Sequence, residues 1–530
     1  MVVSRQGIVA TSQTLASQAG AQILARGGSA VDAAIAANAV LGIVEPMSNG
    51  IGGDLFAIVW DRKSGKLTGL NASGWAPQAL SIEFLKGKGQ TSMPQLGIHS
   101  VTVPGCVDGW EKLHGRFGKL PLAELLRLAI YFAENGFPVT EIIQSGWEAS
   151  TRKLAADPNA KRIYLPEGRA PRVGEIARNP ELARALRLIA AQGARAYYRG
   201  EIADAILKTS QRLGGTMNAA DLSEFAAEWV EPVSTEYRGW TVYELPPNGQ
   251  GMAALEMLNI METFALSGNA PGSADSLHLK IEAQKLAYAD LLRYLADPRF
   301  QKVPVAGLLS KEYARERARR IDARRASCES VPGTPPRVGT DTIYLSVVDR
   351  EGNIVSLIQS IYQSFGSGVA VDGFGFHLHN RGGLFEIDAS HPNALAGRKR
   401  PFHTIIPAFM EKDGIHIGFG IMGGLNQAQA HAQFVANVVD HQMNIQAALE
   451  APRFTRLNFG GCDVMLEGRI PAEVRRELSR RGHILTVLGD YSGSVGGGQA
   501  VVHDARSGVN YGASSPRKDG AAVPEPAPYF

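Results

Sequence analysis

Cysteine is scarce in this sequence: three cysteines occur in 530 residues, and no two of them form a CxxC pair. Cys106, Cys328 and Cys462 are scattered along the chain, so their spacing argues against a disulfide framework, a zinc knuckle or a redox pair. Such sparse cysteine usage fits a reducing compartment. We therefore expect a cytoplasmic protein.

Excess charge and long apolar runs are also missing. The 54 Lys and Arg residues nearly balance the 51 Asp and Glu residues, which excludes the electrostatic footprint of a nucleic-acid or membrane-surface binder. The N-terminus shows no secretory signal, and the most apolar stretch, which begins at Ala30, is interrupted by Asp32 and Asn38 and is too short to cross a bilayer. The expected partner is a small molecule, with neither nucleic acid nor membrane.

The order of the patterns predicts a mixed α/β (α+β) protein. Helical periodicity covers residues 13–25 and 29–43, and two strands are expected within residues 54–72 around a Lys-Ser-Gly-Lys turn. Residues 120–330 have mainly helical patterns. The chain length allows one large domain or two to four ordinary ones.

Residues 326–341 contain three prolines and two glycines and cannot form a regular element. We expect an exposed linker here. The character of the sequence then changes, because the segments that follow are rich in β-branched residues and read as strands. The first of these strands is expected to start at Thr342.

Thr342 is the first candidate catalytic residue. Taken alone, it is a β-former at the edge of a strand. Its context suggests more, because a Pro/Gly linker ending in Asp341 precedes it. A Thr hydroxyl becomes a useful nucleophile when its own α-amine, with a pKa of about 7.7–8.0, acts as the base. Cleavage of the Asp341–Thr342 bond would create that amine.

The segment GFGIMGG, residues 418–424, matches the GxGxxG pattern of dinucleotide-binding proteins. That assignment needs a second parallel strand after the following helix, and the sequence there, FTRLNFGGCDVM, is broken by glycines. The N–H groups of Gly423 and Gly424 could instead stabilise an oxyanion. A simple strand-to-helix turn is the alternative.

The segment FHLHNRGGLF, residues 376–385, contains two histidines at alternate positions and Arg381 beside a glycine pair. An HxH without a third ligand is a weak metal signal, and we expect no metal and no cofactor. A guanidinium recognises carboxylates in a bidentate manner, so Arg381 is a candidate substrate clamp. A surface Arg in a turn is the alternative.

Long motifs in both halves resemble one known family. The small subunit of the γ-glutamyltransferase family of N-terminal nucleophile (Ntn) hydrolases is similar to TIYLSVVDREGNIVSLIQSIYQSFGSG, LHNRGGLF, GGLNQAQAHAQ and YGASSPRKDGAA. Its large subunit is similar to GIVATSQTLASQAGAQILARGGSAVDAAIAANAVLGIVEPMSNGIGGDLFAIV, VPGCVDGW, ELPPNGQGMAALEMLNIME and HLKIEAQKLAYADLLRYLADPRF. The resemblance implies the Ntn-hydrolase fold, a four-layer αββα sandwich that both subunits of a self-cleaved precursor build as one domain.

The resemblance also implies roles for individual residues. The cut would fall between Asp341 and Thr342, giving a large (α) subunit of residues 1–341 and a small (β) catalytic subunit of residues 342–530. The product would be a heterodimer, with a dimer of heterodimers as an alternative. Thr342 matches the nucleophile, Ser360 matches a second hydroxyl residue that hydrogen-bonds it, and Gly423 and Gly424 match the oxyanion pair.

Several positions depart from the pattern of the glutathione-cleaving members. The Arg that binds the glutamate carboxylate is replaced by Ile82, and the acid that holds its ammonium is replaced by Leu384. A buried ammonium without a carboxylate partner would cost several kcal/mol. The substrate-binding candidates in this sequence are Arg381, Tyr362, His403 and Thr404.

These departures resemble the branch of cephalosporin (glutaryl) acylases and oxamate amidohydrolase, whose substrates carry a carboxylate without an α-amine. The expected function is self-processing followed by transfer of an acyl group from a small-molecule amide to water or an amine. A glutathione hydrolase or γ-glutamyltransferase proper is one alternative. An unprocessed, inactive binding protein is another, and a dinucleotide enzyme is a third.

Overall fold

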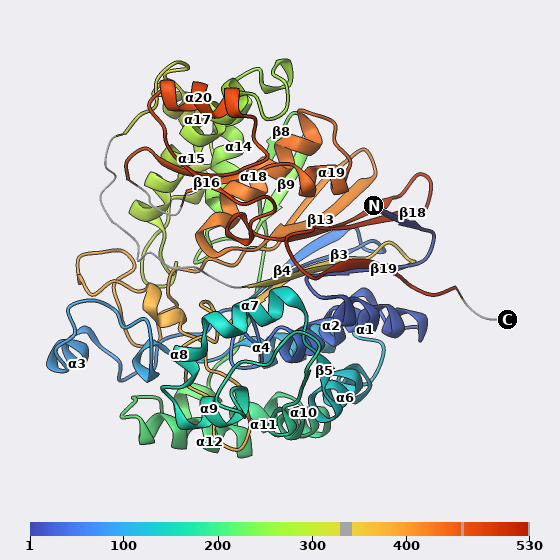
Figure 1. The fold of residues 1–530 in the computed structure, drawn as a ribbon, viewed down its shortest axis with the longest axis vertical. Helices are drawn as coiled ribbons and strands as arrows, with labels where there is room; N and C mark the ends of the chain where they lie inside the picture. The colour runs from blue at the N-terminus through green and yellow to red at the C-terminus, as the bar shows by residue number, and fades with distance from the viewer. Residues whose placement is uncertain (329–341, 457–459, 528–530) are drawn as a thin grey trace.

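The structure is a computed structural model that describes residues 1–328, 342–456 and 460–527. Two seven-stranded sheets pack face to face at its centre, and helices cover the outer face of each sheet (Figure 1). All strand pairs within these two sheets are antiparallel. The expected four-layer αββα sandwich is therefore present.

Each sheet takes strands from both sides of residue 342. The first has the order β1 (Val2–Ser4), β18 (Val509–Ser514), β17 (Gly498–Asp504), β13 (Ile415–Ile421), β12 (Ala408–Lys412), β9 (Trp240–Glu244) and β8 (Val233–Tyr237). The second has the order β19 (Ala521–Pro524), β2 (Ile8–Thr11), β10 (Ile343–Val348), β11 (Ile354–Ser360), β3 (Asp54–Asp61), β4 (Lys66–Ala72) and β7 (Glu228–Val230). The C-terminal third is thus not a separate sheet unit.

Strand β10 shows why these segments read as continuous apolar runs. Ile343, Leu345 and Val347 pack into the core beneath one helical layer, whereas Tyr344 and Val348 pack between the two sheets. Successive side chains of a strand point to opposite faces, so a strand in the middle of a four-layer fold buries both faces. All six residues of β10 are buried accordingly.

Two helical layers enclose the sheets. The β10 side is covered by helices that include α1 (Thr14–Ala25), α2 (Ala30–Val44), α4 (Cys106–Phe117), α6 (Arg127–Asn135) and α10 (Pro180–Gln192). The β13 side is covered by α14 (Gly251–Glu262), α15 (Ala274–Tyr294), α18 (Gln427–Val439) and α19 (Ile445–Glu450). Asp32, which interrupts the apolar run of α2, forms a capping box with Ser29 at the start of that helix.

Shorter elements complete the chain. The other helices are α3 (Ile82–Gly87), α5 (Leu122–Leu125), α7 (Glu141–Ala149), α8 (Thr151–Leu154), α9 (Pro158–Tyr164), α11 (Ala194–Tyr198), α12 (Glu201–Arg212), α13 (Ala219–Ser223), α16 (Val305–Leu308) and α17 (Lys311–Ala318). A small lobe of β14 (Phe454–Thr455), β15 (Asp463–Glu467), β16 (Ile484–Leu488) and α20 (Ala472–Arg480) packs on α15. A two-stranded ribbon joins β5 (Phe137–Pro138) and β6 (Ile176–Ala177).

The prediction against cysteine pairing was wrong. Cys328 and Cys462 form a disulfide, and Cys106 is buried and free. The two paired residues are 134 positions apart. The spacing rule recognises cysteines that are close in sequence, whereas here the packing of the small lobe on α15 brings distant ones together. Because two of the three cysteines are paired, the cysteine pattern no longer supports a reducing compartment.

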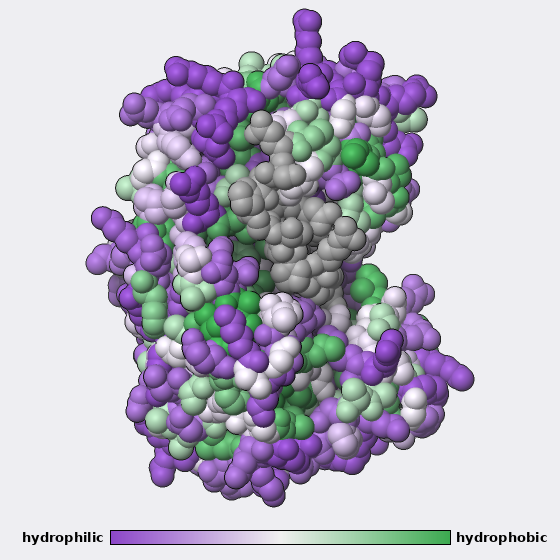
Figure 2. Space-filling model, turned by 90° about the vertical axis from the view of Figure 1, so that its left-hand side faces the viewer, coloured by the Kyte–Doolittle hydropathy of each residue, from purple (hydrophilic) through white to green (hydrophobic). Residues whose placement is uncertain are grey.

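Figure 2 shows mainly hydrophilic side chains along the outline of the molecule, and the hydrophobic side chains on this face form small groups. In the described part of the chain, no helix combines the length and apolar character needed to cross a membrane. Asp341 and the rest of the expected linker from residue 329 lie outside the described residues.

Candidate active site

Thr342 and Ser360 meet at the ends of two neighbouring strands. Strand β10 starts directly after Thr342, β11 ends at Ser360, and the antiparallel register pairs Ile343 with Gln359. The Thr342 hydroxyl therefore reaches across and donates to Ser360 Oγ at 3.2 Å. The contact that the resemblance implied is present, and the antiparallel pairing of β10 with β11 sets its register.

Tyr362 holds Ser360 from the other side. Its backbone N–H donates to Ser360 Oγ at 2.8 Å, and its φ of 75° lies in the left-handed region that large side chains rarely adopt. The Tyr362 ring is buried with the Arg381 guanidinium 4.7 Å from its centre. This packing keeps the turn in place, so the Ser360 hydroxyl has a fixed direction beneath Thr342.

A glycine turn lies beside Thr342 at the end of β13. Gly423 has a φ of 118°, and Gly424 begins the short helix η4 (Gly424–Asn426) that leads into α18. The first N–H groups of a helix have no partner inside it, and none of the described residues accepts a hydrogen bond from the N–H of Gly423 or Gly424. The turn can therefore present two donors to a developing oxyanion.

Side-chain contacts fix this turn. Asn426 Nδ2 donates to the carbonyl of Val495 at 2.8 Å, and the N–H of Met422 donates to the carbonyl of Gly497 at 2.9 Å. A helical turn from 493 to 495 therefore forms the opposite wall. Donors held this firmly need no rearrangement when charge develops, which is the condition for effective electrostatic catalysis.

Thr342 and Gly423 line one cavity of about 420 Å³. Its wall also contains apolar side chains, among them Met47, Ile142 and Met422. The charged residues in its wall are Glu45, Glu141, Arg517 and Lys518, of which Arg517 is already paired with Glu467. Lys518 Nζ lies 2.9 Å from Glu45 Oε1. A larger cavity of about 750 Å³ contains none of the predicted catalytic residues. The smaller cavity is therefore the candidate active site.

The four predicted substrate-binding residues do not line that cavity. Arg381, His403 and Thr404 form a buried network around Asp54, a residue that the sequence did not single out. Asp54 Oδ2 lies 3.1 Å from Arg381 Nε, 2.9 Å from His403 Nε2 and 3.0 Å from His379 Nδ1. Arg381 Nη1 donates to Thr404 Oγ1 at 2.7 Å. Substrate binding by these residues stays a prediction.

Asp54 connects this network to the catalytic strand pair. It starts β3 and lies opposite Ser360 in the register of β3 and β11. The preceding Gly53 allows the close approach, because a Cβ there would lie 2.3 Å from the Ser360 carbonyl oxygen. The segment Gly-Gly-Asp before an apolar strand was the available sequence signal for this contact.

The electrostatics of the network favour an ionised Asp54 and a neutral His403. Burial alone would raise the pKa of Asp54, but the contacts with His379 and His403 hold it well below its usual value. Burial, with the Arg381 guanidinium beside it, lowers the pKa of His403 to about 3. The network therefore pairs one carboxylate with the Arg381 cation.

Buried histidines predict a loss of stability in acid. Burial lowers the pKa of His377, His403 and His431 to about 3, from a usual value near 6.5. As the pH falls below about 6.5, the unfolded chain binds protons at these positions and the folded chain does not. We expect the free energy of unfolding to fall by about 1.4 kcal/mol per pH unit for each histidine.

Chemical denaturation at a series of pH values between 7 and 5 measures this slope. His377→Phe is the matched variant, because the His377 ring packs against Tyr164 and Phe365 in tilted and edge-on contacts and can be replaced by another aromatic ring. In the variant, the decrease in the free energy of unfolding per pH unit should be smaller by about 1.4 kcal/mol, the contribution of one histidine. An unchanged slope in the variant would contradict the assignment for His377.

The metal and dinucleotide motifs are not supported by the geometry. His377 and His379 point to different partners, an aromatic cluster and Asp54 respectively. Strand β13, which carries the GxGxxG pattern, pairs antiparallel with both of its neighbours, so it does not open a βαβ unit.

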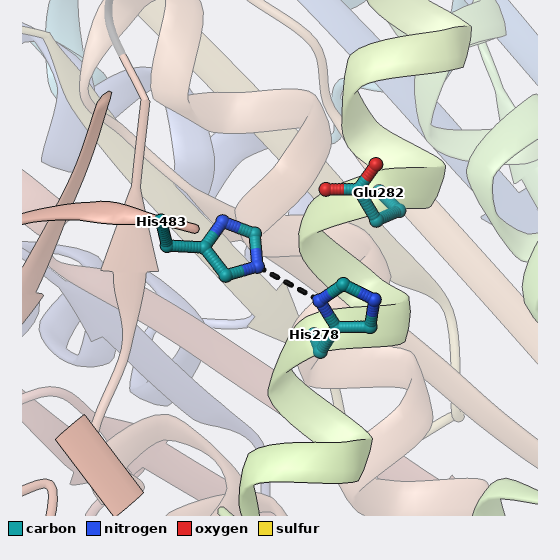
Figure 3. Close-up of side chains that lie close together, drawn as sticks. All are labelled: His278, Glu282 and His483. Carbon is teal, nitrogen blue, oxygen red and sulfur yellow. Dashed lines mark hydrogen bonds between the residues drawn. The ribbon is translucent and has the colours of Figure 1, made fainter. Parts of the chain in front are cut away.

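A different group in the described part of the chain could supply three metal ligands. His278 and Glu282 lie on α15 and face His483 from the small lobe, with the ligand atoms within 4.8 Å of one another (Figure 3). Glu282 is already paired with Lys285 Nζ at 2.6 Å. A cation here would have to displace that ammonium, so the group is not a ready metal site.

Comparison with known proteins decides the family. The family model described as gamma-glutamyltranspeptidase matches residues 16–525. The chain belongs to the γ-glutamyltranspeptidase family. Among solved structures, cephalosporin acylase from Bacillus halodurans is similar, with 44% identity, a TM-score of 0.92, and coverage of 98% of this chain and 96% of that one.

Curated members of the γ-glutamyltranspeptidase family match over the whole length. The glutathione hydrolase-like YwrD proenzyme of Bacillus subtilis is 38% identical over 98% of this chain and 99% of its own length. The oxamate amidohydrolase proenzyme of Klebsiella pneumoniae is 34% identical over 98% and 99%. This γ-glutamyltranspeptidase-family member is accordingly a self-processing Ntn amidohydrolase/acyltransferase, related to the acylase and oxamate amidohydrolase branch.

Proposed function

We propose that Thr342 is the nucleophile and that the chain cuts itself between Asp341 and Thr342 into a large subunit of residues 1–341 and a small subunit of residues 342–530. The single observation that carries this proposal is the hydrogen bond from Thr342, which lines the cavity together with Gly423, to the buried Ser360. The freed α-amine then serves as the base, because its usual pKa lies near neutrality.

The reaction follows from these positions. Thr342 Oγ attacks the amide carbonyl while the α-amine takes its proton, and the N–H groups of Gly423 and Gly424 stabilise the oxyanion. Collapse of the tetrahedral intermediate releases the amine and leaves an acyl group on Thr342. Water or a second amine then attacks this ester and regenerates the hydroxyl.

The substrate class follows from the charges available. At the two positions where glutathione-cleaving relatives are expected to hold the glutamate α-carboxylate and ammonium, this chain has Ile82 and Leu384, which carry no charge and are both buried. Lys518, by contrast, brings an ammonium to the cavity of Thr342. An ammonium in the wall of this cavity favours a substrate that carries a carboxylate. The acyl group therefore derives from a dicarboxylic acid without an α-amine, as in glutaryl amides or in oxamate, the amide of an oxalyl group.

The test compares two substrates in two variants. Lys518→Met should lower kcat/KM for a glutaryl amide by roughly 10- to 100-fold, the value of one charge-assisted hydrogen bond of about 1.5–3 kcal/mol. It should leave a butyryl amide, which has no second carboxylate, nearly unchanged. Lys518→Arg should retain most of the glutaryl activity. Equal losses on both amides would mean that Lys518 does not recognise the carboxylate.

The cytoplasmic location and the oligomeric state belong to the same proposal and stay predictions. Fractionation of the producing cells and light scattering of the purified enzyme test them. A γ-glutamyl amide belongs in the same substrate panel, because preference for it over a glutaryl amide would favour a glutathione hydrolase instead.

A further inference from the structure

The last described residues before the proposed cut contact residues that follow the cut in the sequence. Ala326 N–H donates to the Arg481 carbonyl at 2.7 Å, and Cys328 is bonded to Cys462. Ala326 and Cys328 precede Thr342, whereas Arg481 and Cys462 follow it. The end of the large-subunit sequence is thus anchored to the small lobe, a part of the molecule outside the active-site cavity.

We propose that the Cys328–Cys462 bond is an inter-subunit disulfide in the processed enzyme, so that the two subunits remain covalently joined after the chain is cut. The proposal rests on the proposed cut between Asp341 and Thr342, because that cut separates the two cysteines into different polypeptides. In the uncut precursor the same bond only closes a loop.

The surroundings of the bond suit reversible thiol chemistry. Lys285 Nζ lies 3.9 Å from Cys462 Sγ and donates to the Ser327 carbonyl at 2.7 Å. A neighbouring ammonium favours the thiolate, which is the reactive form of cysteine. Lys285 itself is held by Glu282, one turn along α15 from His278, with His483 opposite (Figure 3). Glu282, a member of the cluster that is not a ready metal site, thus positions the Lys285 ammonium beside Cys462 Sγ.

The two cysteine residues differ in their exposure to solvent. Cys328 is exposed, and Cys462 is 2% exposed. A low-molecular-weight disulfide, such as glutathione disulfide, can therefore react first with the Cys328 thiolate, releasing one thiol and leaving a mixed disulfide. The Cys462 thiolate then attacks Cys328 Sγ and releases the second thiol. Two electrons and two protons pass from the protein to the small disulfide, and an external dithiol reverses the reaction.

The link changes how the subunits can separate. With the disulfide closed, each subunit stays at a high effective concentration near the other, because the tether makes reassociation intramolecular. With the disulfide reduced, non-covalent contacts alone hold the processed pair. The bond is a redox-controlled clamp between the subunits.

Electrophoresis of the processed enzyme tests the clamp. The enzyme is incubated with glutathione disulfide, quenched with N-ethylmaleimide, denatured, and run with and without dithiothreitol. We expect one full-size band without reductant and two bands with it. Cys328→Ser and Cys462→Ser should each give two bands in both lanes. Two bands from the wild type in both lanes would overturn the proposal.

Alkylation under denaturing conditions separates failure of the clamp from failure of the cut. The intact chain of a Thr342→Ala variant contains three cysteines, of which only Cys106 should react if the disulfide is closed. One maleimide adduct supports the bond even where no cut occurs, and three adducts overturn it. A wild-type chain that stays whole in both lanes refutes the proposed cut and with it the inter-subunit link.

Discussion

Thr342→Ala is expected to leave the chain uncut and to abolish amide hydrolysis. The variant lacks the hydroxyl that we propose attacks the Asp341 carbonyl, and it also lacks the nucleophile that the proposed cut would expose. Loss of a nucleophile that works as a unit with its base costs on the order of 10⁴- to 10⁶-fold in kcat. Intact mass before and after incubation measures the cut, and hydrolysis of a glutaryl amide measures turnover.

Two controls sharpen this result. Thr342→Ser keeps a hydroxyl and should still cut, although more slowly because the methyl group no longer fixes the rotamer. Thr340→Ala removes a threonine two residues earlier and should cut as the wild type does. Fragments with the same boundary from Thr342→Ala would show that another residue is the nucleophile.

Asp54→Ala is expected to destabilise the fold by about 3–5 kcal/mol, because it leaves the buried Arg381 guanidinium without its carboxylate. Asp54 also accepts the N–H of Gly74 at 3.0 Å and touches both His379 and His403. Since Asp54 lies opposite Ser360, self-cleavage should slow as well. Denaturant unfolding and the fraction cleaved after a fixed time measure the two effects.

A double-mutant cycle isolates the ion pair. Asp54→Asn should be strongly destabilising, and Asp54→Asn combined with Arg381→Gln should recover part of the loss, because the second change removes the unpaired charge. Strictly additive losses would mean that the two residues do not interact as an ion pair. If Arg381 instead binds substrate, Arg381→Gln alone should raise KM without lowering stability.

The local patterns predicted much of the fold because they depend on neighbours in sequence. Alanine-rich periodicity located α1 and α2, and the Lys-Ser-Gly-Lys turn located β3 and β4. The pairing of Thr342 with Ser360 needed the resemblance in addition, since no local rule sets the register of β10 against β11. Once that register is known, the meeting of the two hydroxyl groups follows from strand geometry.

Long-range contacts could not be predicted in this way. The bond between Cys328 and Cys462 depends on the packing of the small lobe on α15, and the burial of Arg381 depends on Asp54, which is 327 residues away. The segment NRGG around Arg381 is compatible both with an exposed Arg that binds a substrate carboxylate and with a buried Arg that pairs with Asp54. Only the three-dimensional structure distinguishes them.

Strands from both proposed subunits alternate within the sheets, and this affects how the enzyme can be produced. In the second sheet, β2 from the large-subunit sequence lies between β19 and β10, and β11 lies between β10 and β3. A strand inserted between two others cannot be added to a finished sheet without opening it. Two separate genes for residues 1–341 and 342–530 should therefore give little active enzyme. The two polypeptides would have to fold together into shared sheets without the peptide bond that joins them in the precursor.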